Sequence, residues 1–153
     1  MRTKIETIIN ASREARTDQD WEKIDQQISA LADVDPNQAA QVALAFVTDQ
    51  DSRVRDTTAS ILTFLPIDDP QVMATSVNHM INMAKSDRDV FASGRAATFL
   101  LKHQENDEYK LSISQALYDF KSRAVINNWN QDLIQNIPNP QLHQLLISNQ
   151  SNS

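Results

Sequence analysis

The sequence contains no cysteine, and its 153 residues include a single glycine, Gly94. Without cysteine the chain can form no disulfide framework, no thiolate metal site and no cysteine nucleophile. Two-residue β-hairpin turns and phosphate-binding loops both depend on glycine, because their backbones need positive φ angles or the close approach of a ligand. The scarcity of glycine therefore favours an all-α fold and argues against enzymes that bind nucleotides.

Long apolar runs and clusters of basic residues are also missing from the sequence. No apolar stretch approaches the roughly 20 residues that a membrane-spanning helix needs. The N-terminal stretch has the period of an amphipathic helix and lacks the core of a signal peptide. The net charge is −6 and the basic residues are scattered, whereas a protein that binds nucleic acid needs a basic face. We expect a cytoplasmic protein that binds neither membranes nor nucleic acids.

What the sequence does contain is a regular series of helix-start signals. Ser, Thr, Asp and Asn cap helix N-termini, and proline fits the first helical position. These signals recur about every 15 to 19 residues, beginning with a capping box formed by Thr3 and Glu6. The later starts are Thr17 or Asp18, Asp35 with Pro36, Asp51, Asp69 with Pro70, Ser86 or Asp87, Asn106 or Asp107, a weaker one near Arg123 or Ala124, and Asn139 with Pro140.

The even spacing of these starts predicts paired helices, with about 33 to 37 residues in each pair. Apolar residues follow helical spacing between the starts, as at Trp21, Ile24, Ile28 and Leu31. Repeated helix pairs of this length are typical of an α-solenoid, in which each pair buries its faces against its neighbours. We predict an all-α solenoid of about four antiparallel helix pairs plus a C-terminal capping helix. It forms one domain over residues 1–148, followed by a disordered polar tail at 149–153.

One stretch of sequence occurs twice. DSRVRDTTASILTFL at 51–65 is echoed by SDRDVFASGRAATFLL at 86–101. The first stretch resembles the second helix of a HEAT repeat, and the residues that carry the resemblance are Asp51, Val54, Arg55, Ala59 and Leu62. In the second stretch, the residues that align with the last four of these are Phe91, Ala92, Ala96 and Phe99. The resemblance implies a HEAT-like family (HEAT or armadillo type), in which the arginine of the Val-Arg pair joins a ladder of ion pairs between repeats. Arg55 could join such a ladder. Ala92 and Asn127, which stand in place of this arginine in the later repeats, cannot.

The histidines and carboxylates follow patterns that structural roles explain. His79, His103 and His143 fall on different predicted helices, and none has a second histidine or paired carboxylate at the i, i+4 spacing of a helix-borne zinc site. The paired aspartates lie at predicted helix junctions, where aspartate is favoured for capping. We therefore expect no catalytic, cofactor-binding or metal-binding residues.

Three residues are candidates for binding a partner: Arg55, Arg95 and Trp129. Arg55 and Arg95 lie on the row of second helices that lines the concave face of the predicted solenoid. Gly94 and Arg95 interrupt an apolar pattern, either because glycine permits close helix packing or because Arg95 pairs with a carboxylate of a partner. Trp129 and Trp21 fit core positions, but an exposed tryptophan would be a binding anchor, and polar residues surround Trp129.

These observations favour a non-enzymatic protein–protein interaction module, a small HEAT-like scaffold or adaptor that binds a protein or peptide on its concave face. The partner could be basic, because the chain is acidic. The acidic charge also leaves open an inhibitor or immunity-type protein that blocks a basic partner. An enzyme or a HEAT-like lyase accessory is a further alternative, because HEAT-like repeats resemble those of phycobilin lyases and some helical-repeat proteins are DNA glycosylases. The chain has no cysteine and no basic groove to support either role.

Overall fold

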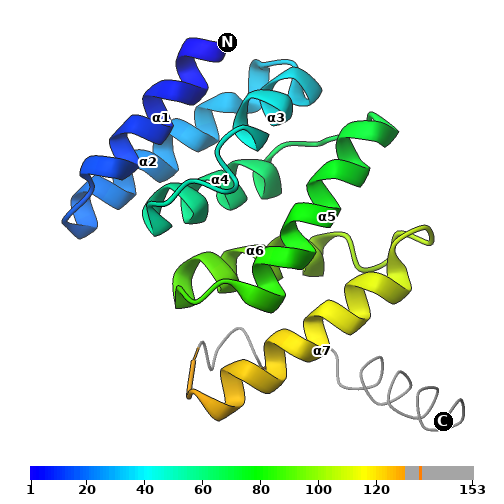
Figure 1. Cartoon of the computed structure of the whole chain (residues 1–153). Helices are drawn as coiled ribbons and strands as arrows, with labels where there is room; N and C mark the ends of the chain where they lie inside the picture. Colours follow the sequence, from blue (N-terminus) through cyan, green and yellow to red (C-terminus); the bar gives the residue numbers. More distant parts are fainter. Residues whose placement is uncertain (130–134, 136–153) are drawn as a thin grey trace, which may run out of the picture. The chain divides into compact units, whose positions relative to one another are not determined.

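The computed structural model describes residues 1–129 and 135, and Figure 1 shows that helices dominate this part of the chain. The elements are α1 (Arg2–Glu14), α2 (Asp18–Ser29), the 3-10 helix η1 (Ala30–Asp33), α3 (Pro36–Leu44), α4 (Ser52–Phe64), α5 (Pro70–Ser86), α6 (Val90–Lys102) and α7 (Lys110–Ile126). The described residues contain no β-strand, so the all-α prediction is confirmed. None of the helices in this part of the chain combines the length and the apolar character needed to cross a membrane.

The chain divides into two compact units, Met1–His79 and Met80–Ser153, and the division falls within α5. In the first unit α1 contacts α2, α3 and α4, and α4 also contacts α2 and α3. In the second unit α6 packs on α7. Each unit has fully buried large side chains: Ile5, Ile9, Val54, Ile61, Leu62 and Leu65 in the first, and Met80, Phe99, Leu100, Ile113, Leu117 and Phe120 in the second. Each unit therefore has a core of its own.

Several of the expected N-caps are confirmed in the structure. The hydroxyl of Thr17 accepts the N–H of Asp20 at 3.2 Å, and the carboxylate of Asp20 accepts the N–H of Thr17 at 3.0 Å, so the two form a capping box. Aspartate side chains accept N–H groups from the first turns of α3, α4 and α5; these are Asp35, Asp51 and Asp69. Their capping bonds satisfy N–H groups that the helix itself leaves unpaired.

Other expected starts are wrong. α1 begins at Arg2 without a side-chain cap, so Thr3 lies inside the helix, and the Glu6 carboxylate pairs with Arg2 at 3.0 Å. α6 is capped by Asp89, whose carboxylate accepts the N–H groups of the first turn, rather than by Ser86 or Asp87. At α6 the neighbouring residues offer several possible caps, and the choice among them depends on where the helix packs.

The segment around Arg123 and Ala124 contains no helix start. Both residues lie within α7, which begins at Lys110 and continues to Ile126. Neither Asn106 nor Asp107 caps this helix; the Asn106 side chain accepts the N–H of Glu108 at 3.0 Å in the preceding turn. The expected start at Asn139 and the expected polar tail at 149–153 lie outside the described residues.

α7 ends in a Schellman motif. The N–H of Trp129 donates to the carbonyl of Ala124 at 2.7 Å, and the N–H of Asn128 donates to the carbonyl of Val125 at 3.3 Å. Asn128 has φ 57, and asparagine tolerates this left-handed conformation better than most residues. The adjacent asparagines 127 and 128 therefore mark a helix end, although they read in the sequence only as polar surroundings for Trp129.

The two similar stretches lie on α4 and α6, but their register differs from the expected one. The N-caps Asp51 and Asp89 are 38 residues apart, so Ala92 aligns with Val54 and Leu100 aligns with Leu62. All four of these aligned residues are buried, whereas Phe91, which the sequence suggested as the match of Val54, is 67% exposed. The expected alignment was one residue out of register. Gly94 is buried in α6, in keeping with close helix packing.

Candidate functional site

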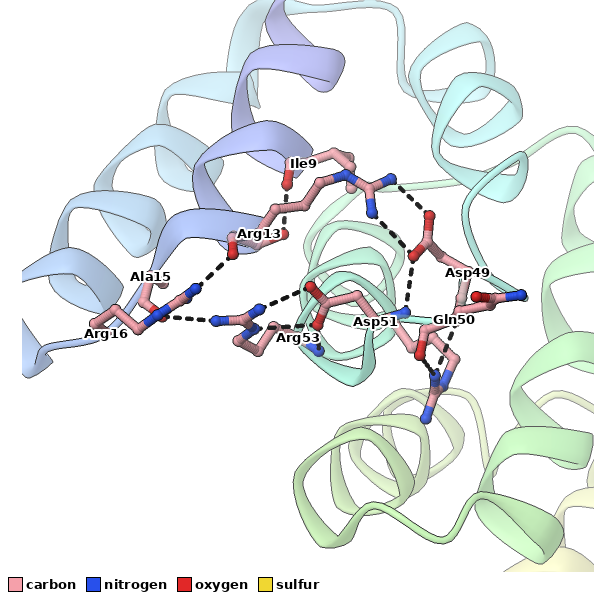
Figure 2. Close-up of polar contacts among 10 residues, drawn as sticks. Ile9, Arg13, Ala15, Arg16, Asp49, Gln50, Asp51 and Arg53 are labelled. Atoms are coloured by element: carbon pink, nitrogen blue, oxygen red, sulfur yellow. Dashed lines mark hydrogen bonds and ion pairs between the residues drawn. The ribbon is translucent and has the colours of Figure 1, made fainter.

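Arginines and aspartates from the end of α1, the loop between α3 and α4 and the first turn of α4 form a polar cluster in the first unit (Figure 2). Arg13 donates two hydrogen bonds to Asp49, from Nη1 to Oδ1 at 3.0 Å and from Nη2 to Oδ2 at 2.6 Å. Asp49 also accepts the N–H of Asp51 at 2.9 Å. The hydrogen bond from Arg13 and the N–H of Asp51 lower the pKa of the Asp49 carboxyl, and Asp49 in turn raises the pKa of Arg13. The pair joins residues 36 positions apart in the chain.

The other arginines of this cluster bond to backbone carbonyls. Arg53 holds both carboxylate oxygens of Asp51, at 3.1 and 2.9 Å, and its Nη1 donates to the carbonyl of Ala15 at 3.2 Å. Arg16 donates to the same carbonyl at 2.8 Å. Arg55 donates to the carbonyls of Asp49 at 2.9 Å and Gln50 at 3.1 Å. The cluster therefore satisfies carbonyl groups just after α1 and in the α3–α4 loop, and half-buried Arg55 takes part in it.

Arg95 lies on the outward face of α6, in the second unit. Phe91, Arg95, Thr98 and Lys102 recur at i, i+4, i+7 and i+11, which places them on one face of the helix. We call these four residues the α6 stripe. Phe91 is 67% exposed, Arg95 and Lys102 are exposed, and Thr98 is half-buried. The helix contains no acidic residue, so its outward face combines an aromatic ring with two cations.

Trp129 is half-buried beside Arg123 at the end of α7. The guanidinium carbon of Arg123 lies 5.4 Å from the Trp129 ring centroid, within the range of a cation–π contact. The same guanidinium donates to the carbonyls of Ala84 at 2.7 Å and Asp87 at 2.6 Å, at the end of α5. Arg123 thus links α5, α7 and Trp129, a role that its position in the sequence did not suggest. Trp21 is also half-buried, so neither tryptophan is a fully buried core residue.

The three candidate residues lie on separate segments. Arg55 belongs to α4 in the first unit, whereas Arg95 on α6 and Trp129 after α7 belong to the second. Arg55 and Trp129 are half-buried. Arg95 presents an exposed side chain on a helix face that also carries a large exposed apolar residue. Because its side chain is the exposed one of the three, Arg95 is the best placed to meet a partner.

The first unit also has a pocket, and the second has a histidine whose pKa is shifted. The pocket has a volume of about 280 Å³, lies where α1 faces the end of α2 and η1, and has Lys4 as its one ionisable lining residue. The His103 ring lies 4.5 Å from the Phe99 ring, centroid to centroid, and burial followed by the charge of Lys102 lowers its pKa. In the part of the chain that the structure describes, no three histidine or carboxylate side chains are grouped so that they could hold a metal ion.

Comparison of the chain with models of protein families found no match, and searches of curated proteins and of solved structures found no similar protein either. The HEAT-like resemblance therefore depends on the quoted residues alone and stays a prediction.

Proposed function

We propose that the chain is a non-enzymatic protein-interaction module that binds an acidic segment of a partner protein on the α6 stripe. The observation that carries this proposal is the exposure of Phe91 on the same helix face as Arg95 and Lys102. Exposed large aromatic side chains and arginines are enriched among the residues that dominate interface energies, and charge complementarity selects the partner. Arg95 keeps the partner-binding role expected of it, whereas Arg55 and Trp129 are assigned to the internal framework.

The spacing of the helices supports a HEAT-like solenoid as the framework of this module. The first helices of the proposed pairs α1–α2, α3–α4 and α5–α6 begin at residues 2, 36 and 70, which are 34 residues apart. Within the first unit the corresponding helices touch, α1 with α3 and α2 with α4. Contacts between corresponding helices of successive pairs are what a solenoid requires. In this arrangement α6 is the second helix of its pair.

The geometry of the stripe restricts the chemistry of the partner. Arg95 and Lys102 are separated by seven residues, or about 10 Å along the helix axis. A partner helix could meet both with acidic side chains one heptad apart, and an apolar side chain beyond them would cover Phe91. Partial burial lowers the pKa of Lys102, so the charge of a carboxylate placed against it would offset part of the solvation that its ammonium group has lost.

Peptide binding tests this function. Fluorescence anisotropy would compare a labelled amphipathic peptide carrying Glu one heptad apart with the same peptide carrying Lys. We expect the Glu peptide to bind and the Lys peptide not to bind, and we expect Phe91→Ser and the pair Arg95→Glu with Lys102→Glu each to weaken binding at least tenfold. Lys110→Glu is the matched control, because Lys110 is exposed on α7 outside the stripe. Equal losses in this control and in the stripe variants would contradict the proposal.

A second candidate function, an acidic inhibitor of a basic protein, is favoured by the charge of the first unit. That unit holds thirteen acidic and seven basic residues, whereas the second unit holds seven of each. The exposed side of α2 is especially acidic and carries Asp18, Glu22 and Asp25. If this candidate is right, binding to a panel of basic proteins will weaken steeply with salt, and Glu22→Lys with Asp25→Lys will abolish it while Phe91→Ser has no effect.

A further inference from the structure

α7 carries apolar residues on two opposite faces. Ile113, Leu117 and Phe120 are buried on the inner face, which packs in the second unit. On the other face Leu111 is 69% exposed, Val125 is 58% exposed and Ile126 is 82% exposed, and Tyr118 is half-buried between them. We call Leu111, Tyr118, Val125 and Ile126 the α7 outer stripe.

The arrangement of the α7 outer stripe is that of a helix-packing surface. Leu111, Tyr118 and Val125 are spaced by seven residues, so they stay on one side of the helix. The residues between them on this face, Gln115 and Ser122, are uncharged. Single exposed apolar residues need no explanation, but a continuous uncharged stripe of this length marks a surface that another apolar element covers.

We propose that residues 137–147 of the same chain cover the α7 outer stripe. The chain leaves α7 in the Schellman turn at Asn128, directly beyond Val125 and Ile126. The segment that follows, IPNPQLHQLLI, has no acidic or basic residue other than His143, and Leu142, Leu145 and Leu146 follow the i, i+3, i+4 spacing of an apolar helix face. Its apolar and uncharged character therefore matches that of the stripe.

The length of the connection is sufficient for this contact. Residues 130–134 can span up to about 18 Å when extended, Gln135 is helical, and the stripe from Leu111 to Val125 covers about 21 Å of helix, so a segment that starts near Val125 can run back along the stripe. A short tether of this kind keeps the segment at an effective concentration on the order of millimolar. At micromolar protein concentrations the tethered segment therefore has an advantage over a second copy of the chain or a separate partner. This inference concerns α7 and does not depend on the function proposed for α6.

Paramagnetic relaxation in the full chain tests the proposal, and the absence of cysteine allows a single labelling site. A spin label attached through Gln144→Cys should remove more than half of the methyl signal intensity of Val125 and Ile126. Leu145→Ser with Leu146→Ser in the labelled protein should restore these intensities, because it removes the apolar face of the segment. Gln141→Ser, a polar change in the same segment, is the matched control and should leave the signal loss in place.

A mixed sample identifies the occupant of the stripe. In this sample the spin-labelled chain carries no isotopes and the isotope-labelled chain carries no spin label. We expect no loss of intensity there, because the contact is within one chain. If the loss occurs in the mixed sample, a second copy covers the stripe and the proposal is wrong. If neither sample loses intensity, residues 137–147 do not reach α7 and the proposal is also wrong.

Discussion

Arginine side chains in both units donate to backbone carbonyls at or just beyond helix ends. Arg53 bonds to the carbonyl of Ala15 after α1, and Arg123 bonds to the carbonyl of Ala84 in the last turn of α5. A guanidinium group offers five donors, and the carbonyls at a helix C-terminus lack partners within the helix and carry partial negative charge. These arginines therefore contribute to stability by fixing helix ends, and their substitution by lysine would lose the planar arrangement of donors.

The pair of Arg13 and Asp49 makes stability depend on pH. Because Arg13 lowers the pKa of Asp49 below its ordinary value of 3.8, the pair stabilises the fold above that pH, and the contribution disappears as the pH falls through the lowered pKa. We expect Asp49→Asn to reduce the free energy of unfolding at pH 7 by about 1 kcal/mol. Urea unfolding at pH 7 and near pH 3 measures this. Equal losses at both values would contradict the role of the ionised carboxylate.

His103 should add a second pH dependence at higher pH. Burial and the neighbouring Lys102 lower its pKa below the ordinary value of 6.5, so the unfolded chain binds a proton more readily than the folded chain does. Above about pH 6.5 the histidine therefore costs the fold no stability. As the pH decreases from there toward the lowered pKa, the free energy of unfolding decreases. We expect His103→Gln to reduce the loss of thermal stability between pH 7.5 and pH 5, measured by circular dichroism. An unchanged loss would show that other groups cause it.

The contacts of individual residues divide into those that the sequence can predict and those that it cannot. The bonds made by Asp35 and Asp51 to the first turns of their helices join residues two or three apart, so composition and local order reveal them. The bond between Arg13 and Asp49 joins residues 36 apart. Such a bond becomes visible only when packing brings α1 against the α3–α4 loop, so the sequence did not suggest it.

At the scale of elements, some helix starts could be predicted from local capping groups, whereas the register of α6 could not. The starts of α2, α3, α4 and α5 follow local capping groups and were expected within a residue. α6 shows the limit: its pattern admits Phe91 or Ala92 as the first packed residue, and only the buried neighbours make Ala92 the correct one. For the candidate site, Arg95 was singled out as a break in the apolar pattern, but the exposure of Phe91 on the same face followed from this shift of register.

The Schellman motif at the end of α7 allows a prediction about that element. Asn128 adopts φ 57, a conformation that glycine enters without strain and that a β-branched side chain strongly opposes. We expect Asn128→Val to destabilise the protein by about 1–2 kcal/mol and Asn128→Gly to have little effect. Urea unfolding followed by circular dichroism compares the two. Equal effects would mean that the asparagine side chain, and not the backbone conformation, is what matters at this position.

At the scale of the whole molecule, charge and tryptophan are divided between the two units. The net charge of −6 belongs to the first unit, because the second holds equal numbers of acidic and basic residues. Repulsion among like charges destabilises a compact state, and added salt screens it. The first unit also holds Trp21 alone and the second holds Trp129 alone. The fluorescence of a single remaining tryptophan can therefore report on each unit separately.

We expect salt to stabilise the first unit more than the second. In Trp129→Phe, the fluorescence of Trp21 follows the first unit, and in Trp21→Phe the fluorescence of Trp129 follows the second. Raising sodium chloride from about 20 to about 300 mM shortens the screening length from roughly 20 Å to under 10 Å, so the urea midpoint reported by Trp21 should rise by more than that reported by Trp129. Sodium chloride acts here mainly by screening, and an uncharged osmolyte such as sucrose, which stabilises without screening, should remove the difference. Equal midpoint shifts in sodium chloride would mean that the two units unfold together or that charge repulsion does not reduce the stability of the first unit.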